Sequence, residues 1–84
     1  MTDSPKDFRI KITVRNNRIL ARMEELGIAS QSELGALCGH NQSTVGAVIS
    51  FKMKSMRDGE WTKIALDVAT ALKTEPEHLW PEQL

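Results

Sequence analysis

The chain offers few side chains in the arrangements that catalysis requires. Its two histidines, His40 and His78, do not stand at the spacing of a metal site or of a catalytic triad. The adjacent carboxylates Glu24 and Glu25 fit a solvated helix surface, and the glycines occur singly and not as a phosphate-binding loop. We therefore expect no enzymatic activity, no metal ion and no cofactor.

A different chemistry is possible at Gln42, Ser43 and Thr44, which would stand in the first turn of a helix. A glutamine amide can pair with N6 and N7 of adenine, and a serine hydroxyl can donate to or accept from several bases. Gly46 and Ala47 lack bulk, which permits close approach, and an alanine methyl can contact a thymine methyl. On their own, however, these residues are more typical of an ordinary helix start, where serine and threonine favour capping.

A first helix is predicted just before these residues. Ser30 and Glu33 form an S-x-x-E capping box, which predicts a helix from Gln31 to about Cys38. Its apolar face should hold Leu34, Leu37 and Cys38. Gly39 supplies the positive φ angle that ends the helix.

A second helix follows directly. Asn41 can cap it, and it should run over residues 42–50 with Val45, Val48 and Ile49 pointing inward. Two short helices joined by a glycine-containing turn describe a helix-turn-helix, here residues 31–50.

This stretch resembles the helix-turn-helix of the phage lambda repressor and Cro family, the XRE type. Gln31 stands at its first position and Gly39 at its ninth. Run 42–47, Gln-Ser-Thr-Val-Gly-Ala, is close to a recognition helix of this family. The apolar residues at its fourth, eighth, fifteenth and eighteenth positions are Leu34, Cys38, Val45 and Val48.

Two residues depart from the family pattern. Gly35 stands where the family usually has alanine, and His40 stands where it usually has an aliphatic residue. Glycine costs about 1 kcal/mol of helix propensity against alanine, but a small residue keeps the close approach between the two helices. His40 is expected to weaken the apolar packing of the turn.

The resemblance implies a function: a sequence-specific transcriptional regulator that binds double-stranded DNA, such as a small phage or bacterial repressor-like protein. Helix 41–50 would read the major groove. Gln31 would bind a phosphate and buttress Gln42, while residues after the helix and at the start of the chain would contact further phosphates. The residues expected at the DNA are Gln31, Asn41, Gln42, Ser43, Thr44, Gly46, Ala47, Ser50, Lys52, Lys54, Arg15 and Arg18.

The charges leave a second function open. The 11 basic and 11 acidic residues balance, whereas the footprint of a nucleic-acid-binding domain is usually basic. Basic residues gather in the first quarter of the chain and after residue 50, which could orient the molecule on phosphates. The alternative is a protein–protein interaction module that reuses the helix-turn-helix fold to bind RNA polymerase, a toxin or a repressor.

A homodimer is expected on DNA, because one recognition helix covers too few base pairs to discriminate well. Two surfaces could pair the copies. One is the edge of a predicted N-terminal strand, and the other is the last short helix with Leu79, Trp80 and Leu84. The resemblance favours the last helix, whereas the unusual strand favours its edge; of the two, the last helix is preferred.

That N-terminal strand is predicted over residues 8–15, where apolar and polar residues alternate. Residues 49–54 alternate as well, so the two segments are expected to pair as a small sheet. Its apolar side, facing the core, would hold Phe8, Ile10, Ile12, Phe51 and Met53, and its other side Arg9, Lys11, Lys52 and Lys54.

Three further helices complete the prediction. One begins at a cap provided by Asn16 or Asn17 and ends near Leu26. After a turn centred on Asp58 and Gly59, a strongly apolar helix over residues 60–73 should be covered on most of its sides. A short helix then starts near residues 74–76 and ends before residue 81.

The sequence thus predicts a single domain, residues 1–84, with a mostly α, five-helix lambda-repressor-like fold and an added N-terminal strand. One cysteine excludes an internal disulfide framework and fits a reducing cytoplasm. No apolar run approaches the ~20 residues that cross a bilayer, and the N-terminus lacks the apolar core of a signal peptide. We therefore expect a cytoplasmic protein that does not bind a membrane.

Overall fold

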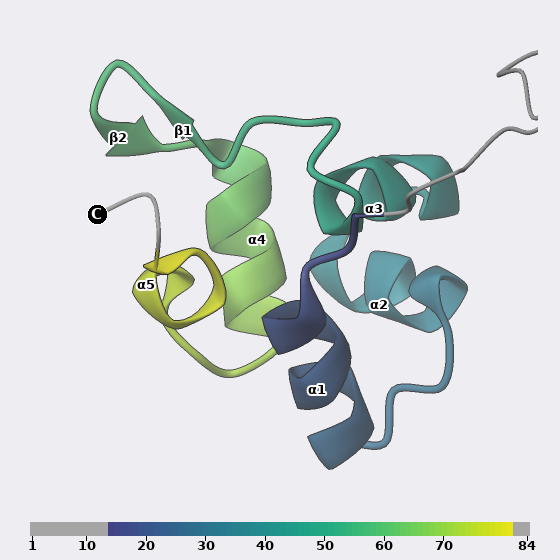
Figure 1. The fold of residues 1–84 in the computed structure, drawn as a ribbon. Helices are drawn as coiled ribbons and strands as arrows, with labels where there is room; N and C mark the ends of the chain where they lie inside the picture. The colour runs from purple at the N-terminus through teal and green to yellow at the C-terminus, as the bar shows by residue number, and fades with distance from the viewer. Residues whose placement is uncertain (1–13, 82–84) are drawn as a thin grey trace, which may run out of the picture.

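The computed structural model of the protein describes residues 14–81, in which five helices and one two-stranded antiparallel sheet are found (Figure 1). The elements in chain order are α1 (Asn17–Glu25), α2 (Gln31–Cys38), α3 (Gln42–Ile49), β1 (Met56–Arg57), β2 (Glu60–Trp61), α4 (Lys63–Ala71) and α5 (Pro76–Leu79). The prediction of five helices in a mostly helical domain is confirmed.

Four of the helices begin at a polar residue in extended backbone. Asn16, Ser30, Asn41 and Thr62 precede α1, α2, α3 and α4, and the side-chain oxygen of each accepts a hydrogen bond from a backbone N–H in the first turn. Such a cap typically stabilises a helix by about 1 kcal/mol. The caps at Ser30 and Asn41 confirm the sequence prediction, and Asn16 is the capping residue of the two asparagines considered.

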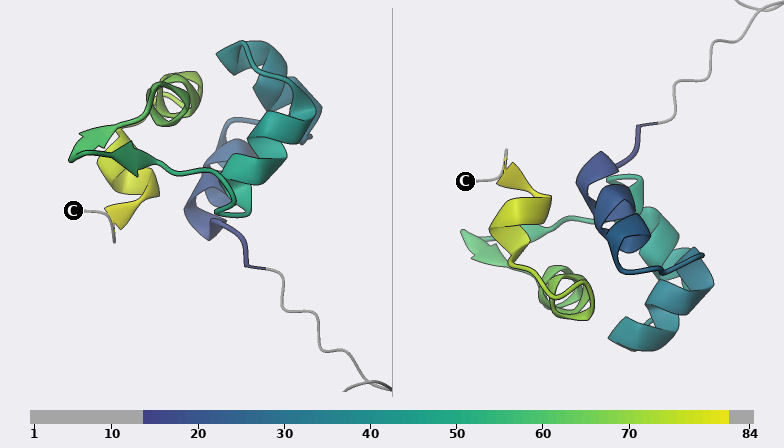
Figure 2. Two further views of the ribbon diagram at one scale, coloured as in Figure 1. Left: turned by 90° about the horizontal axis from the view of Figure 1, so that it is seen from above. Right: turned by 90° about the horizontal axis from the view of Figure 1, so that it is seen from below.

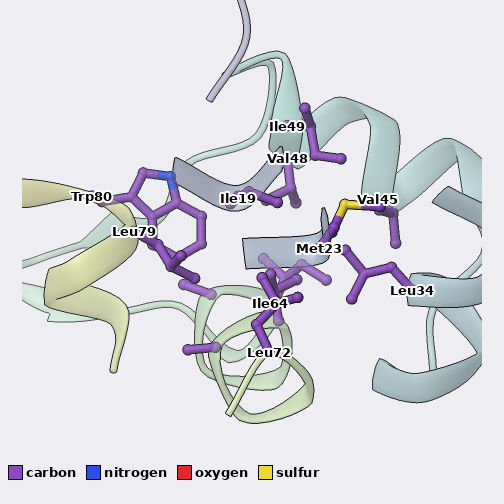
Figure 3. Close-up of a cluster of buried hydrophobic side chains, with 13 residues drawn as sticks. Ile19, Met23, Leu34, Val45, Val48, Ile49, Ile64, Leu72, Leu79 and Trp80 are labelled. Atoms are coloured by element: carbon purple, nitrogen blue, oxygen red, sulfur yellow. The ribbon is translucent and has the colours of Figure 1, made fainter. Parts of the chain in front are cut away.

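Side chains from all five helices meet in one core (Figure 3). Ile19 of α1 lies at its centre, between Leu34 of α2 on one side and Trp80, just after α5, on the other. The other buried apolar residues are Met23, Val45, Val48, Ile49, Ile64, Ala65, Val68, Ala69, Leu72 and Leu79. The inward positions predicted for Val45, Val48 and Ile49 are confirmed.

Leu37 lies outside this core, contrary to the prediction for the apolar face of α2, and Leu66 of α4 lies outside it as well. Leu37 is 61% exposed and Leu66 46% exposed. In α2 the buried side runs through Leu34 and Gly35, and Gly35 faces the backbone of the turn that follows the helix. Leu37 is therefore turned toward solvent.

The predicted pairing of two copies through Leu79 and Trp80 also conflicts with the structure. The two side chains are 3% and 2% exposed because they complete the core between α1 and α4. They are therefore unavailable to a second molecule. Leu84 lies outside the described residues.

The prediction of a strand over residues 49–54 is wrong. Ile49 is the last residue of α3, and the following residues form a loop. Phe51 adopts a left-handed conformation, φ 61°, and its N–H donates to the Val48 carbonyl while the N–H of Lys52 donates to that of Ala47. This pair of bonds closes the helix and turns the chain away from its axis.

Other parts of the predicted sheet also differ. Phe51 and Met53, expected on the core, are 44% and 41% exposed. The strand predicted over residues 8–15 falls mostly outside the described residues, and Val14 and Arg15, which are described, belong to no strand.

The sheet is instead a hairpin in the middle of the chain. Met56 pairs with Trp61 and Arg57 with Glu60. The turn between them is the predicted Asp58-Gly59, and both of its residues have positive φ, which suits the twist of a two-residue hairpin. Helix α4 is therefore shorter than predicted, since residues 60 and 61 belong to β2.

Within residues 14–81, no helix combines the length and the apolar character needed to span a membrane.

Candidate nucleic-acid interface

Helices α2 and α3 pack against each other, and α2 also packs against α4. Backbone hydrogen bonds to the last turn of α2 hold the turn between α2 and α3. Gly39 has φ 79°, and the backbone N–H groups of Gly39 and His40 both donate to the Gly35 carbonyl, at 2.8 and 2.9 Å. These hydrogen bonds fix the turn to the end of α2, and the turn sets the direction in which α3 starts.

Gly35 makes this turn possible. A Cβ atom at this position would lie 2.5 Å from the carbonyl oxygen of His40, a distance that real Cβ atoms do not show. The close approach is therefore to the backbone of the turn itself, whereas the sequence suggested an approach between the helices. This contact explains why glycine stands here in place of alanine.

His40 connects the turn to α4 through a polar contact with Asp67. Its Nε2 lies 2.8 Å from Oδ2 of Asp67, and Nζ of Lys63 lies at the same distance from that oxygen. Because an ionised carboxylate only accepts, Nε2 carries the proton. The hydrogen bonds from Lys63 and from His40 lower the pKa of Asp67 below its ordinary value.

The sequence did not reveal this link, since His40 and Asp67 are 27 residues apart. Only the i,i+4 spacing of Lys63 and Asp67 was visible as a local signal.

The first turn of α3 presents its polar side chains to solvent. Gln42 and Ser43 are exposed, while Thr44 and Ala47 are half-buried. Asn41 is exposed too, but its Oδ1 accepts the N–H of Thr44 at 2.8 Å, so it acts as the cap of the helix. The helix carries no charged residue, and its outer surface is therefore made of amide, hydroxyl and methyl groups.

Gln31 at the start of α2 lies over α3. A Cβ atom at Gly46 would come within 2.9 Å of Oε1 of Gln31, so the amide rests against the glycine. The neighbour of Gln31 is thus Gly46, one turn beyond Gln42. No hydrogen bond joins the two glutamines, although both belong to the described part of the chain. The buttressing of Gln42 by Gln31 therefore stays a prediction.

Cations flank the C-terminal end of α3. The N–H of Asn16 donates to the carbonyl of Ile49 at 2.7 Å, which places the neighbouring Arg15 beside the end of the helix. The backbone N–H of Lys52 donates to the Ala47 carbonyl, which keeps this residue beside the same end of the helix. Both side chains are exposed, as are those of Arg18 and Lys54.

None of these four cations forms a salt bridge with another residue of the 14–81 segment. Ser50, also expected near phosphates, is half-buried as the C-cap of α3. Helix α3 thus has a neutral, polar start and, beside its C-terminal end, the exposed cations Arg15 and Lys52, while Arg18 lies in the first turn of α1 and Lys54 in the loop before β1.

Cys38 is a separate feature of α2. Its thiol is half-buried and points to the carbonyl of Gly35, with Sγ at 3.7 Å from the oxygen. Burial raises the pKa of the thiol, so the reactive thiolate is disfavoured. Across residues 14–81, no three His, Cys, Asp or Glu side chains gather as a metal site.

Comparison of the chain with protein-family models, with curated proteins and with solved structures found no match.

Proposed function

We propose that this protein is a sequence-specific DNA-binding transcriptional regulator of the lambda repressor and Cro type. The observation that carries the proposal is the exposed first turn of α3, where Gln42 and Ser43 project from a rigidly held helix. An α-helix fits the major groove of B-DNA, and an amide or hydroxyl in its first turn can reach base edges.

The charges around α3 support the same proposal. Backbone phosphates would face the exposed cations at the end of the helix, Arg15 and Lys52. Contacts of this kind fix register and orientation, whereas contacts with base edges carry the sequence information. A neutral reading surface bordered by cations divides the two tasks between different residues.

The way α3 is held supports it further. Base readout requires side chains that are positioned before binding. Gly35 admits the tight turn, His40 binds α4 through Asp67, and Gln31 rests on Gly46. Each of these contacts limits the movement of α3 relative to the core.

The test is a selection of bound sequences from a random pool of duplex DNA, followed by affinity measurements against salt. We expect one enriched sequence, a steep fall in affinity as salt rises, and weaker binding to random duplex. Failure to enrich any sequence, together with salt-independent binding, would reject DNA recognition. That outcome would favour the protein–protein interaction module instead.

A further inference from the structure

A hollow of about 400 Å³ opens beside the loop that follows α3. It is bounded by the loop, by β1 of the hairpin and by the start of α4. Three of its six lining residues are cations: Lys52 and Lys54 from the loop and Arg57 from β1. The other three are Met53, Thr62 and Ile64.

The three cations are gathered without a counterion from the described chain. All three side chains are exposed, and none forms a salt bridge with a residue of the 14–81 segment. Asp58 and Glu60 lie on the same hairpin, and Glu60 is the cross-strand partner of Arg57 in register, yet neither carboxylate closes an ion pair. Like charges that share one hollow repel one another, and an anion there relieves the repulsion.

The backbone around the hollow is fixed at both ends. The N–H of Thr62 donates to the Ser55 carbonyl at 2.8 Å, and its hydroxyl donates to the Lys54 carbonyl at 3.0 Å. At the other end, the N–H of Lys52 is bonded to the Ala47 carbonyl of α3. The cations therefore stand on a framework tied to both α3 and α4.

The three cations lie at increasing distance along the chain from the end of α3. Lys52 lies at the end of the helix and Arg57 lies on β1, at the far end of the loop. Seen from above, the loop runs from the end of α3 to the hairpin on the opposite side of the molecule (Figure 2).

We propose that Lys52, Lys54 and Arg57, which line the hollow, form a phosphate-binding site. Through this site the β1–β2 hairpin makes a second contact with the DNA backbone, beyond the segment read by α3. The inference rests on the proposed DNA binding. The ligand is the phosphodiester of the duplex. The arginine guanidinium suits this role because its planar fork can bind two phosphate oxygens at once.

The test compares Arg57→Gln with a matched control, Lys73→Gln. Both cations are exposed, and Lys73 stands beyond the C-terminal end of α4, away from the hollow. Binding is measured against salt on two duplexes: the shortest one that retains sequence-specific binding, and the same site lengthened by about one helical turn at each end.

Lengthening should raise the affinity of the unmodified protein and steepen its salt dependence. Arg57→Gln should remove most of this gain and reduce the salt slope on the long duplex by about one. Lys73→Gln should leave both quantities unchanged. Equal unfolding midpoints in urea would establish that the two variants are equally well folded.

Two results would overturn the proposed phosphate-binding site. In the first, Arg57→Gln gains as much from lengthening as the unmodified protein does. In the second, inorganic phosphate alone saturates the hollow at a low concentration while duplex length has no effect, which would assign the hollow to a small phosphate ligand. If the unmodified protein did not bind DNA at all, the proposed function itself would be refuted. Failure of the proposed function and failure of the phosphate-binding site are therefore distinguishable.

Discussion

Asn16 shows how much one side chain contributes beyond its local role. It is 3% exposed and makes bonds to three elements. Its Oδ1 caps α1, its N–H donates to the last residue of α3, and its Nδ2 donates to the Leu79 carbonyl of α5 at 2.8 Å. The sequence predicted the cap because capping is local. The other two bonds join residues far apart in the chain, and no local pattern signals them.

Asn16→Asp separates these roles, because aspartate keeps the capping oxygen and loses the amide donor. The Leu79 carbonyl would then face a carboxylate in a buried place. We expect a loss of about 1–3 kcal/mol in the free energy of unfolding. Urea unfolding measures it, with Asn17→Asp as a control at an exposed position of the same turn. Identical midpoints for Asn16→Asp and the unmodified protein would show that the bond to α5 contributes nothing.

The effect of adding a Cβ atom can be compared at two glycines, Gly35 and Gly46. Both stand inside helices, where alanine is favoured over glycine by about 1 kcal/mol. At Gly35 the new Cβ would strike the backbone oxygen of His40 at 2.5 Å, whereas at Gly46 it would meet the flexible end of Gln31 at 2.9 Å. Only the second obstacle can move aside at low cost.

We therefore expect Gly35→Ala to lower the free energy of unfolding and Gly46→Ala to leave it unchanged or raise it by up to ~1 kcal/mol. Thermal and urea unfolding of the two variants give the comparison. If Gly35→Ala were the more stable of the two, the approach of the turn to α2 would not restrict this position.

At the scale of elements, the link between the turn and α4 makes stability depend on pH. The pKa of Asp67 is lowered in the folded state by Lys63 and His40. Its contribution is therefore fully present above the carboxylate's ordinary pKa and is lost as pH falls through the lowered value. The acidic range, below about pH 4, is the window in which this link dissolves.

Asp67→Asn should accordingly destabilise the protein at pH 7, and progressively less as pH falls below about 4 toward the lowered pKa of Asp67, below which the aspartate is protonated in both states. The difference in urea midpoint between the variant and the unmodified protein, followed across this range, is the measurement. A difference that stays constant from pH 7 to pH 3 would mean that the charge of Asp67 plays no part.

The boundaries of elements were more predictable than their partners. Ser30, Gly39 and Asn41 mark helix ends through bonds within a few residues, so the sequence alone located α2 and α3. The alternation over residues 49–54 misled because it arose in a helix end and a loop, where Phe51 reverses the chain. A period of two cannot distinguish a strand from such a loop unless the pairing partner is known.

The candidate site divides in the same way. The polar first turn of α3 was predictable, because it depends on register within one helix. The contact of Gln31 with Gly46 and the bond from His40 to Asp67 depend on how separate helices pack, and the sequence did not contain a local signal for either. The hollow that collects Lys54 and Arg57 depends on the hairpin, which was predicted only as a turn.

At the scale of the whole molecule, the arrangement of charge carries more information than its sum. The chain has equal numbers of basic and acidic residues. Arg15, Lys52, Lys54 and Arg57 are nevertheless exposed around the end of α3 and the following loop, and none of them forms a salt bridge with a residue of the 14–81 segment. Glu24 and Glu25 lie at the far end of α1, which points away from α3 (Figure 1). A chain without net charge can thus present one basic side to a duplex.

The central claim is that the first turn of α3 reads bases, and Gln42→Ala tests it most directly. Gln42 is exposed, so its removal should leave the fold intact. Affinity for the selected site and for random duplex is measured at the same salt concentration, with Lys52→Ala as the phosphate-contact control. We predict that Gln42→Ala costs about 1–3 kcal/mol on the selected site and little on random duplex, whereas Lys52→Ala weakens both alike. Equal losses for Gln42→Ala on the two duplexes would contradict base readout by α3.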